Sequence, residues 1–180
     1  MRTPLSLSLP LSPETALSLR AGDRLLLSGE MFTARDAAHK RLCALLSEGK
    51  PLPFPLPGAA IYYAGPAPAE CGRPVGPIGP TTSYRMDAYA PTLLEAGLRV
   101  MIGKGERGPA VLEAMQRFGA VYLAAVGGAA ALLARCVTAC EVIAFEDLGA
   151  EAIRKLIVRD FPVIVAADAF GNTVSPPNML

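Results

Sequence analysis

The sequence predicts a mixed α/β domain, because apolar strands and helices alternate through its middle while strands dominate both ends. The chain has 180 residues, of which 52% are hydrophobic and 18% charged, so it can bury a sizeable core. Its 17 Lys and Arg residues nearly balance its 16 Asp and Glu residues, which gives no electrostatic reason to expect nucleic acid or a membrane surface as a partner. We expect residues 1–180 to form a single domain.

The N-terminal part of the chain is expected to alternate strands with helices. Leucines alternate with polar residues and proline from Thr3 to Leu11, a period of two that predicts an edge strand. A short helix follows, with Ser12 as the expected N-cap and proline in its first position. An apolar strand over Leu25 to Phe32 leads to a second helix, for which Thr33 is the expected N-cap and Asp36 completes a pattern like a capping box.

The middle of the chain predicts strands and helices joined by two proline-rich loops. Prolines at every second position between Gly49 and Gly58 exclude a helix or a central strand there. A second loop runs from Ala67 to Pro80. The expected strands are Ile61 to Pro66, which ends in a turn, Arg99 to Ile102 and Ala120 to Ala125, and the expected helices are Tyr84 to Gly97, kinked or restarted at Pro91, Pro109 to Phe118 and Ala129 to Cys136.

The C-terminal part predicts short strands separated by turns. The expected strands are Glu141 to Phe145, Leu156 to Val158 and Val163 to Ala167, with a short helix over Ala150 to Ile153 and a hairpin-like turn over Asp168 to Asn172. Since strands also open the chain, the expected sheet is mixed.

The four cysteines do not predict a metal site. Cys43, Cys71, Cys136 and Cys140 contain no CxxC pair, and although the last two can share a helix face, two thiolates are too few for a structural metal. We therefore expect buried or half-buried thiols in a reducing cytoplasm. No secretory signal is expected, and the longest apolar run, Val121 to Ala134, is shorter than the about 20 residues that a membrane span needs. These patterns predict a soluble cytoplasmic protein.

The stretch from Gly79 to Asp87, GPTTSYRMD, combines groups that can hold an anion. Glycine and proline set a turn, Thr81 and Thr82 supply hydroxyls, and Arg85 follows within one helical turn. The alternative is an ordinary turn with a threonine N-cap, because Gly-Pro-Thr-Thr before an apolar run suits either role.

Two further cations are expected beside turns in other segments. Arg35 falls in the first turn of its predicted helix, where the macrodipole favours an anion, and the alternative is a surface arginine paired with Asp36 or Glu30. Lys104 stands between two glycines at the carboxyl end of a predicted strand, where ligands gather in open α/β sheets, or is a solvated turn lysine. His39, the only histidine, shares a helix face with Arg35 and is either a packing residue or a catalyst.

Arg35, Arg85 and Lys104 can converge on one small ligand. Forked guanidinium groups match carboxylates bidentately, so these cations, with the threonine hydroxyls, suit a small dicarboxylate at least as well as a phosphate ester. Gly127 and Gly128, at the start of another helix, can cradle an anion or permit tight packing. The sequence shows neither a metal site nor an activated nucleophile. This combination indicates half of an active site, completed by another subunit.

Six segments resemble one known family, and they occur in the family's order over nearly the whole chain. The family comprises the C-terminal domain of class I iron–sulfur fumarases, which in many organisms is a separate β subunit, and the related β subunit of L-tartrate dehydratase. The segments are Gly29 to Arg41 (GEMFTARDAAHKR), Tyr63 to Pro68 (YAGPAP), Gly72 to Asp87 (GRPVGPIGPTTSYRMD), Gly103 to Gly105, Val126 to Ala130, and Phe161 to Asn172.

The resemblance implies a swivelling β/β/α domain, with a mixed sheet flanked by helices, that packs against an α subunit. That subunit is expected to hold a [4Fe–4S] cluster through three cysteines of its own, so the cysteines of this chain are not expected to be cluster ligands. A heterotetramer of the two subunits is expected, with a homodimer as the alternative when this chain is alone.

The resemblance also assigns roles to residues. It implies that Arg35, Arg85 and Lys104 bind substrate carboxylate. It places Thr81 at the carbon that loses its proton, as the acid/base group once a partner group activates its hydroxyl. A supporting set is expected behind these side chains, with the first two members orienting Arg35: Asp36, His39 and Thr82.

The substrate implied is fumarate, hydrated reversibly to (S)-malate. Tartrate dehydratases are expected to carry a cysteine after the first glycine of the segment Val126 to Ala130, and this chain, like the fumarases, has none. Two alternatives remain open: an L-tartrate dehydratase β subunit, and a dicarboxylate-binding or assembly module without turnover of its own.

Overall fold

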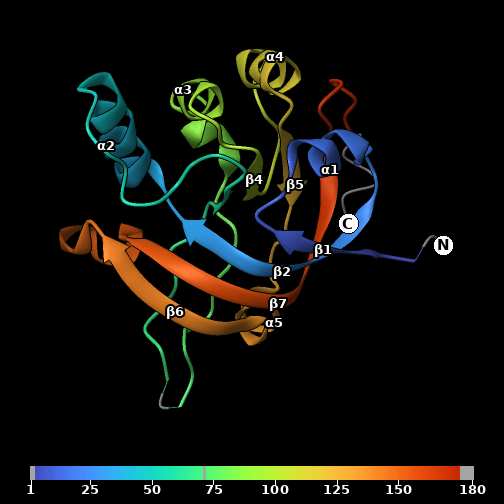
Figure 1. Ribbon diagram of the computed structural model, residues 1–180. Helices are drawn as coiled ribbons and strands as arrows, with labels where there is room; N and C mark the ends of the chain where they lie inside the picture. The colour runs from blue at the N-terminus through green and yellow to red at the C-terminus, as the bar shows by residue number, and fades with distance from the viewer. Residues whose placement is uncertain (1–2, 71, 175–180) are drawn as a thin grey trace.

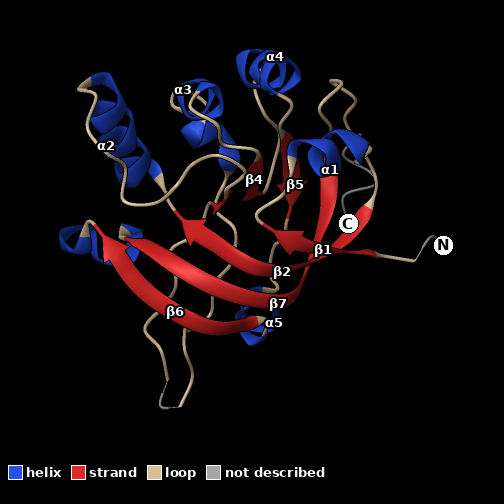
Figure 2. Cartoon of the chain, in the orientation of Figure 1, coloured by secondary structure: helices blue, strands red, loops and turns tan. Residues whose placement is uncertain are grey.

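A mixed seven-stranded sheet forms the centre of the computed structural model, which describes residues 3–70 and 72–174 (Figures 1 and 2). An additional pairing between the second and seventh strands of the chain closes five of the strands into a barrel. In sheet order the strands are β1 (Leu5–Leu9), β2 (Arg24–Thr33), β3 (Ala60–Tyr62), β4 (Val100–Gly103), β5 (Val121–Ala124), β7 (Ile153–Ala167) and β6 (Val137–Ala144).

Helices cover one side of this barrel. Three of them, α2, α3 and α4, lie side by side there, and α5 lies at the opposite end, as Figure 1 shows. The helices are α1 (Pro13–Ser18), α2 (Asp36–Ser47), α3 (Ala90–Glu95), α4 (Pro109–Phe118) and α5 (Ala130–Arg135), with two 3₁₀ helices, η1 (Ser83–Met86) and η2 (Glu146–Glu151). The predicted mixed α/β architecture, with a mixed sheet flanked by helices, is confirmed. No helix in the described residues is long and apolar enough to cross a membrane.

Two apolar clusters fill the two faces of the sheet, because side chains alternate along each strand. In β4, Val100 and Ile102 belong to the cluster inside the barrel, whereas Met101 belongs to the cluster that the helices cover. All three side chains are fully buried. Leu133 of α5 and Ile78 of the long loop after β3 also belong to the inner cluster.

The strands β2, β3, β4 and β5 run parallel to one another. Their carboxyl ends therefore meet at the same edge of the sheet, which is where ligands bind in open parallel sheets. The residues that directly follow three of these strands, Ala34 and Arg35, Tyr63, and Lys104, come together at this edge.

Several predictions made from local sequence patterns are confirmed. Among the described strands β1 pairs with β2 alone, so it is an edge strand. The Ser12 hydroxyl accepts a hydrogen bond from Thr15 N at 3.2 Å and caps α1, with proline in the first helical position. The restart at Pro91 is also confirmed, because η1 ends at Met86 and α3 begins at Ala90.

The predicted cap of α2 is wrong. Thr33 is the last residue of β2, where it pairs with Tyr62 and Arg154, so its hydroxyl serves the sheet: it accepts from Arg154 N at 3.1 Å and donates to Ala152 O at 3.4 Å. The N-cap is Arg35, whose side chain makes no capping bond. A remote carboxylate compensates, because Ala37 N donates to Glu151 Oε2 at 3.2 Å.

The C-terminal elements also differ from the prediction. The predicted helix over Ala150 to Ile153 lies earlier, as η2, and the two predicted strands Leu156 to Val158 and Val163 to Ala167 are parts of one strand, β7. Asp160 adopts a left-handed conformation in a bulge of β7, where Arg159 and Asp160 lie opposite Ser28, and its N–H donates to Ser28 Oγ at 3.0 Å. This bulge lets the long strand follow the curve of the barrel.

Two smaller expectations are wrong as well. β6 begins at Val137, four residues before the predicted start, so Cys136 ends α5 and Cys140 lies in a strand. These two thiols therefore do not share a helix face. Gly127 and Gly128 do not serve tight packing, because a Cβ at either position would meet nothing within 4 Å.

Candidate functional site

The carboxyl edge of the parallel strands gathers the predicted site residues. The loop that carries Thr81 crosses this edge, and Thr81 N donates to Tyr63 O at 2.7 Å. Thr82 pairs with Lys104 in an isolated parallel bridge, and Ser83 N donates to Lys104 O at 2.9 Å. The segment after β3 thus fixes the segment after β4 by backbone bonds. Lys104 itself is exposed, and both threonines are half-buried.

The two predicted arginines reach the same edge from α2 and η1. Arg85 Nε donates to Asp36 Oδ1 at 2.8 Å, which ties η1 to the first turn of α2. Arg35 Nη2 lies 3.4 Å from Glu151 Oε1. The prediction that Asp36 orients Arg35 is therefore wrong in its partner: Asp36 holds Arg85, and Glu151 holds Arg35.

Each of these arginines has nitrogen atoms without a hydrogen-bond partner among the described residues. The structure gives Arg85 no hydrogen bond at its terminal nitrogens among the described residues. Arg35 Nε is buried and has no partner there, and neither has the neighbouring Asp36 Oδ2. An unsatisfied buried polar group costs about 1–3 kcal/mol, so a bound carboxylate that accepts from Arg35 Nε would recover that free energy.

His39 is a buried, uncharged residue that contacts the main chain of Arg35. It is fully buried, its Nδ1 lies 2.9 Å from Arg35 O, and its ring meets Tyr63 edge-on at a centroid distance of 5.2 Å. Burial lowers its pKa to about 4. A carbonyl can only accept, so the neutral ring carries its proton on Nδ1 and steadies the main chain at Arg35.

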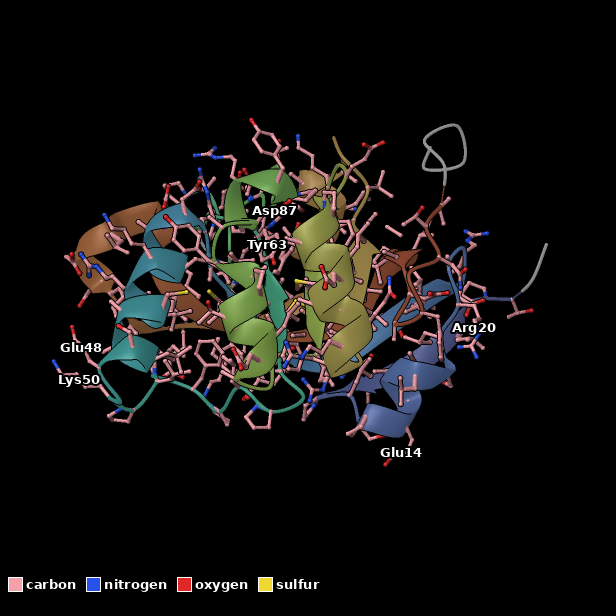
Figure 3. The ribbon with its side chains drawn as sticks, turned by 90° about the horizontal axis from the view of Figure 1, so that it is seen from above. Glu14, Arg20, Glu48, Lys50, Tyr63 and Asp87 are labelled. Atoms are coloured by element: carbon pink, nitrogen blue, oxygen red, sulfur yellow. The ribbon has the colours of Figure 1, made fainter. Side chains whose placement is uncertain are left out.

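A second charged pair lies behind these residues. Arg107 Nε donates to Asp87 Oδ1 at 2.7 Å, Arg107 Nη1 donates to the Tyr63 hydroxyl at 3.2 Å, and Gly108 N donates to Asp87 Oδ2 at 2.6 Å. Figure 3 shows Tyr63 and Asp87 close together beside α3 and α4. The Arg107 side chain is 0% exposed. Sequence reasoning missed this pair, although Asp87 ends the stretch Gly79 to Asp87 and Arg107 follows Lys104 by three residues.

Burial sets the protonation of the inner groups. It raises the pKa of Tyr63 and raises that of Tyr122 to about 12, so both hydroxyls are neutral. Burial opposes the charge on Arg107, yet its hydroxyl and carboxylate neighbours raise its pKa and it stays cationic. Behind the cations of the edge there is thus a buried arginine that is paired with a carboxylate.

The Thr81 hydroxyl has no side chain to activate it. Among the described residues none hydrogen-bonds to Thr81 Oγ1, and an unaided threonine is a poor base. Its predicted acid/base role and the group that would activate it stay predictions.

The described residues do not fit an iron–sulfur cluster. Within residues 3–70 and 72–174 no group of three or more His, Cys, Asp or Glu side chains could hold a metal ion. Cys43, Cys136 and Cys140 are half-buried free thiols in separate elements, and Cys71 lies outside the described residues.

Comparison with known proteins gives a consistent family. The fumarase C-terminus family matches residues 3–176. The chain is 42% identical over 151 residues to the anaerobic class I fumarate hydratase of Escherichia coli, which covers 83% of this chain and 28% of that protein. It thus spans little more than a quarter of the length of that relative.

Two further relatives match along most of their length. The chain is 37% identical over 170 residues to a putative L(+)-tartrate dehydratase subunit beta of Methanocaldococcus jannaschii, covering 91% of this chain and 87% of that protein. It is 34% identical over 177 residues to the L(+)-tartrate dehydratase subunit beta of Escherichia coli, covering 96% and 87%. Because the family matches nearly the whole chain, and the chain has a mixed α/β architecture, this chain belongs to the fumarase C-terminus family.

Proposed function

We propose that this chain supplies the carboxylate-binding half of a hydro-lyase that interconverts fumarate and (S)-malate in the cytoplasm. The observation that carries the proposal is the convergence of Arg35, Arg85 and Lys104 on one sheet edge together with Thr81. The family supports the reaction class, because the relatives are named fumarate hydratase and tartrate dehydratase.

The proposed division of labour follows from the contacts. Arg85 is oriented by Asp36 through Nε, and Arg35 is held by Glu151 through Nη2, so each arginine presents its remaining N–H groups to a substrate carboxylate. Lys104 stands beside them as a flexible point charge. When the carbon next to that carboxylate loses its proton, negative charge develops on the carboxylate oxygens, and these cations stabilise it.

Thr81 is the proposed acid/base group of this chain. It is held by its backbone bond to Tyr63, and its hydroxyl has no internal partner in the described residues. The partner group that activates it, and a [4Fe–4S] cluster, are proposed to belong to an α subunit that docks on this edge. On its own, the chain is expected to bind dicarboxylates weakly and to turn none over.

An assay of the assembled enzyme tests this proposal. The chain is co-expressed with a cluster-bearing partner, reconstituted anaerobically, and given fumarate, mesaconate and L(+)-tartrate side by side. We expect hydration of fumarate by the pair and none by either subunit alone. A pair that turns over none of the three substrates would overturn the enzyme proposal and leave a binding or assembly module.

A second candidate substrate is L(+)-tartrate. The length of the relatives supports this substrate. The tartrate dehydratase beta subunits are separate chains of similar size, and they align with this chain over 87% of their own residues. The same assay decides, because a pair with a higher kcat/KM on tartrate than on fumarate is a tartrate dehydratase.

A further inference from the structure

Two loops that carry substrate cations are joined at three points. These loops are residues 82–87, which hold Arg85, and residues 103–108, which hold Lys104. The first link is the bond from Ser83 N to Lys104 O at 2.9 Å. The second is the Tyr122 hydroxyl, which lies 2.9 Å from Ser83 Oγ and donates to Gly105 O at 2.8 Å.

The third link is the carboxylate of Asp87. Its two oxygens accept from Arg107 Nε at 2.7 Å and from Gly108 N at 2.6 Å, so one side chain of the first loop holds the end of the second. Asp87 follows Arg85 by two residues, and Arg107 follows Lys104 by three. The pair therefore joins the two segments that carry the substrate cations.

The two loops pack closely against each other at Gly103 and Gly108. A Cβ at Gly103 would clash with Ser83 Oγ and would lie 2.9 Å from Tyr63 Cδ2. A Cβ at Gly108 would lie 2.9 Å from Asp87 Oδ2. Because close-packed interiors transmit strain instead of absorbing it, a shift of one loop moves the other.

The Arg107 side chain of this pair is closed to a ligand. The Arg107 side chain is 0% exposed and that of Asp87 22% exposed, and the guanidinium carbon lies 5.3 Å and 5.1 Å from the ring centroids of Tyr63 and Tyr122. A buried arginine needs its carboxylate partner, because removal of one partner leaves an uncompensated charge. The pair is thus built to hold geometry.

We propose that Asp87 and Arg107 are positioning residues that fix the separation of Arg85 and Lys104 around the bound carboxylate, and so select dicarboxylates by the groups that flank that carboxylate. The inference rests on the proposed function of this edge. Neither residue touches substrate. A misplacement of about 1 Å at a substrate-binding group can cost about 10²-fold in rate, so small movements of the loops suffice.

The test compares Asp87→Asn and Arg107→Lys with Asp147→Asn in the assembled enzyme. Asp147 pairs with Arg41 on an exposed surface, with side chains 64% and 41% exposed, and serves as the matched control. Kinetics are measured on fumarate, mesaconate and L(+)-tartrate. Hydrogen exchange is measured on peptides that cover residues 82–87 and 103–108.

The expected outcome is a loss of discrimination. Asp87→Asn should lower kcat/KM on the best substrate by about 10²-fold, mainly through KM, and should shrink its advantage over the other two. Arg107→Lys keeps the positive charge but loses the planar guanidinium group. Its kcat/KM and its substrate discrimination should lie between those of Asp87→Asn and the wild type. Exchange should rise in both loops together, while Asp147→Asn should behave as wild type in all measurements.

The exchange data separate failure of this inference from failure of the proposed function. If the wild-type pair ignores all three substrates but Asp87→Asn loosens both loops together, the proposed function is wrong and the loop coupling stands. If exchange rises in one loop only, or if an active enzyme keeps its substrate ratios in both variants, the positioning role is overturned.

Discussion

The same ion pair, arginine with carboxylate, occurs at two depths in this site. At the edge, the Arg85 and Asp36 side chains are 43% and 29% exposed, and Arg85 uses a single nitrogen. Behind the edge, Arg107 is 0% exposed and uses two nitrogens on Asp87 and Tyr63. We infer from this difference that exposure sets the role: the proposed role of the outer arginine is to bind a ligand, and that of the inner one is to hold two loops together.

The largest expected effect comes from removing the inner carboxylate. Asp87→Ala leaves the Arg107 charge buried without its partner and should lower the free energy of unfolding by about 3–5 kcal/mol. Asp147→Ala, at the exposed pair with Arg41, should cost at most about 1 kcal/mol. Chemical denaturation measures both. Equal losses would mean that the inner pair is no more structural than a surface pair.

Removal of the outer arginine should affect catalysis more than folding. Arg85→Ala is expected to raise KM and lower kcat/KM by about 10- to 100-fold, because a charged hydrogen bond to substrate contributes about 1.5–3 kcal/mol. Its melting temperature should stay close to that of the wild type, since the pair with Asp36 is half-exposed. Steady-state kinetics of the assembled enzyme that match the wild type would exclude Arg85 from substrate binding.

An added methyl group tests the packing between the loops. Gly103→Ala should destabilise the protein by about 1–3 kcal/mol, because the new Cβ meets Ser83 and Tyr63. Gly127→Ala is the matched control at the same edge, where a Cβ meets nothing within 4 Å, and should change stability by less than about 0.5 kcal/mol. Thermal unfolding of the two variants checks this, and a tolerated Gly103→Ala would show that the loops have room to move.

The last prediction concerns the pH dependence of stability. The folded pKa of His39, about 4, lies below the ordinary 6.5, so between these values the unfolded chain binds a proton that the folded chain does not. The free energy of unfolding should therefore fall by about 1.4 kcal/mol per pH unit as pH drops through this window, and His39 should contribute no slope above it. His39→Gln should flatten the dependence. An unchanged slope would mean that His39 is not buried in its neutral form.

Local patterns predicted much of this fold. The Ser12 cap, the edge strand β1, the restart at Pro91 and the strand–turn–helix units are all set by residues close in sequence, and all are present. The closing contact between β2 and β7 joins segments about 130 residues apart, and no local pattern specifies such a pairing. That contact is also why Thr33 lies in a strand and why β7 continues through Asp160.

The candidate site was predictable in its outer part only. Gly79 to Asp87 and Lys104 stand out because glycine, proline and hydroxyl residues surround a cation. The partners of these cations were not predictable: Glu151 reaches Arg35 from a 3₁₀ helix 116 positions later, and Asp36 serves Arg85 instead of its neighbour. Nothing in the amino-acid sequence distinguishes the buried Arg107 from the exposed Arg85, because the burial of each side chain is set by the tertiary fold.

A crystal structure of the assembled enzyme with succinate, a dicarboxylate that has no double bond to hydrate, tests the account most directly. We predict that one succinate carboxylate lies within about 3 Å of free nitrogens of Arg35 and Arg85. Arg107 should remain bonded to Asp87 and Tyr63, as it is in the chain alone. Succinate bound away from these two arginines, or an Arg107 that leaves Asp87 to reach it, would contradict the account.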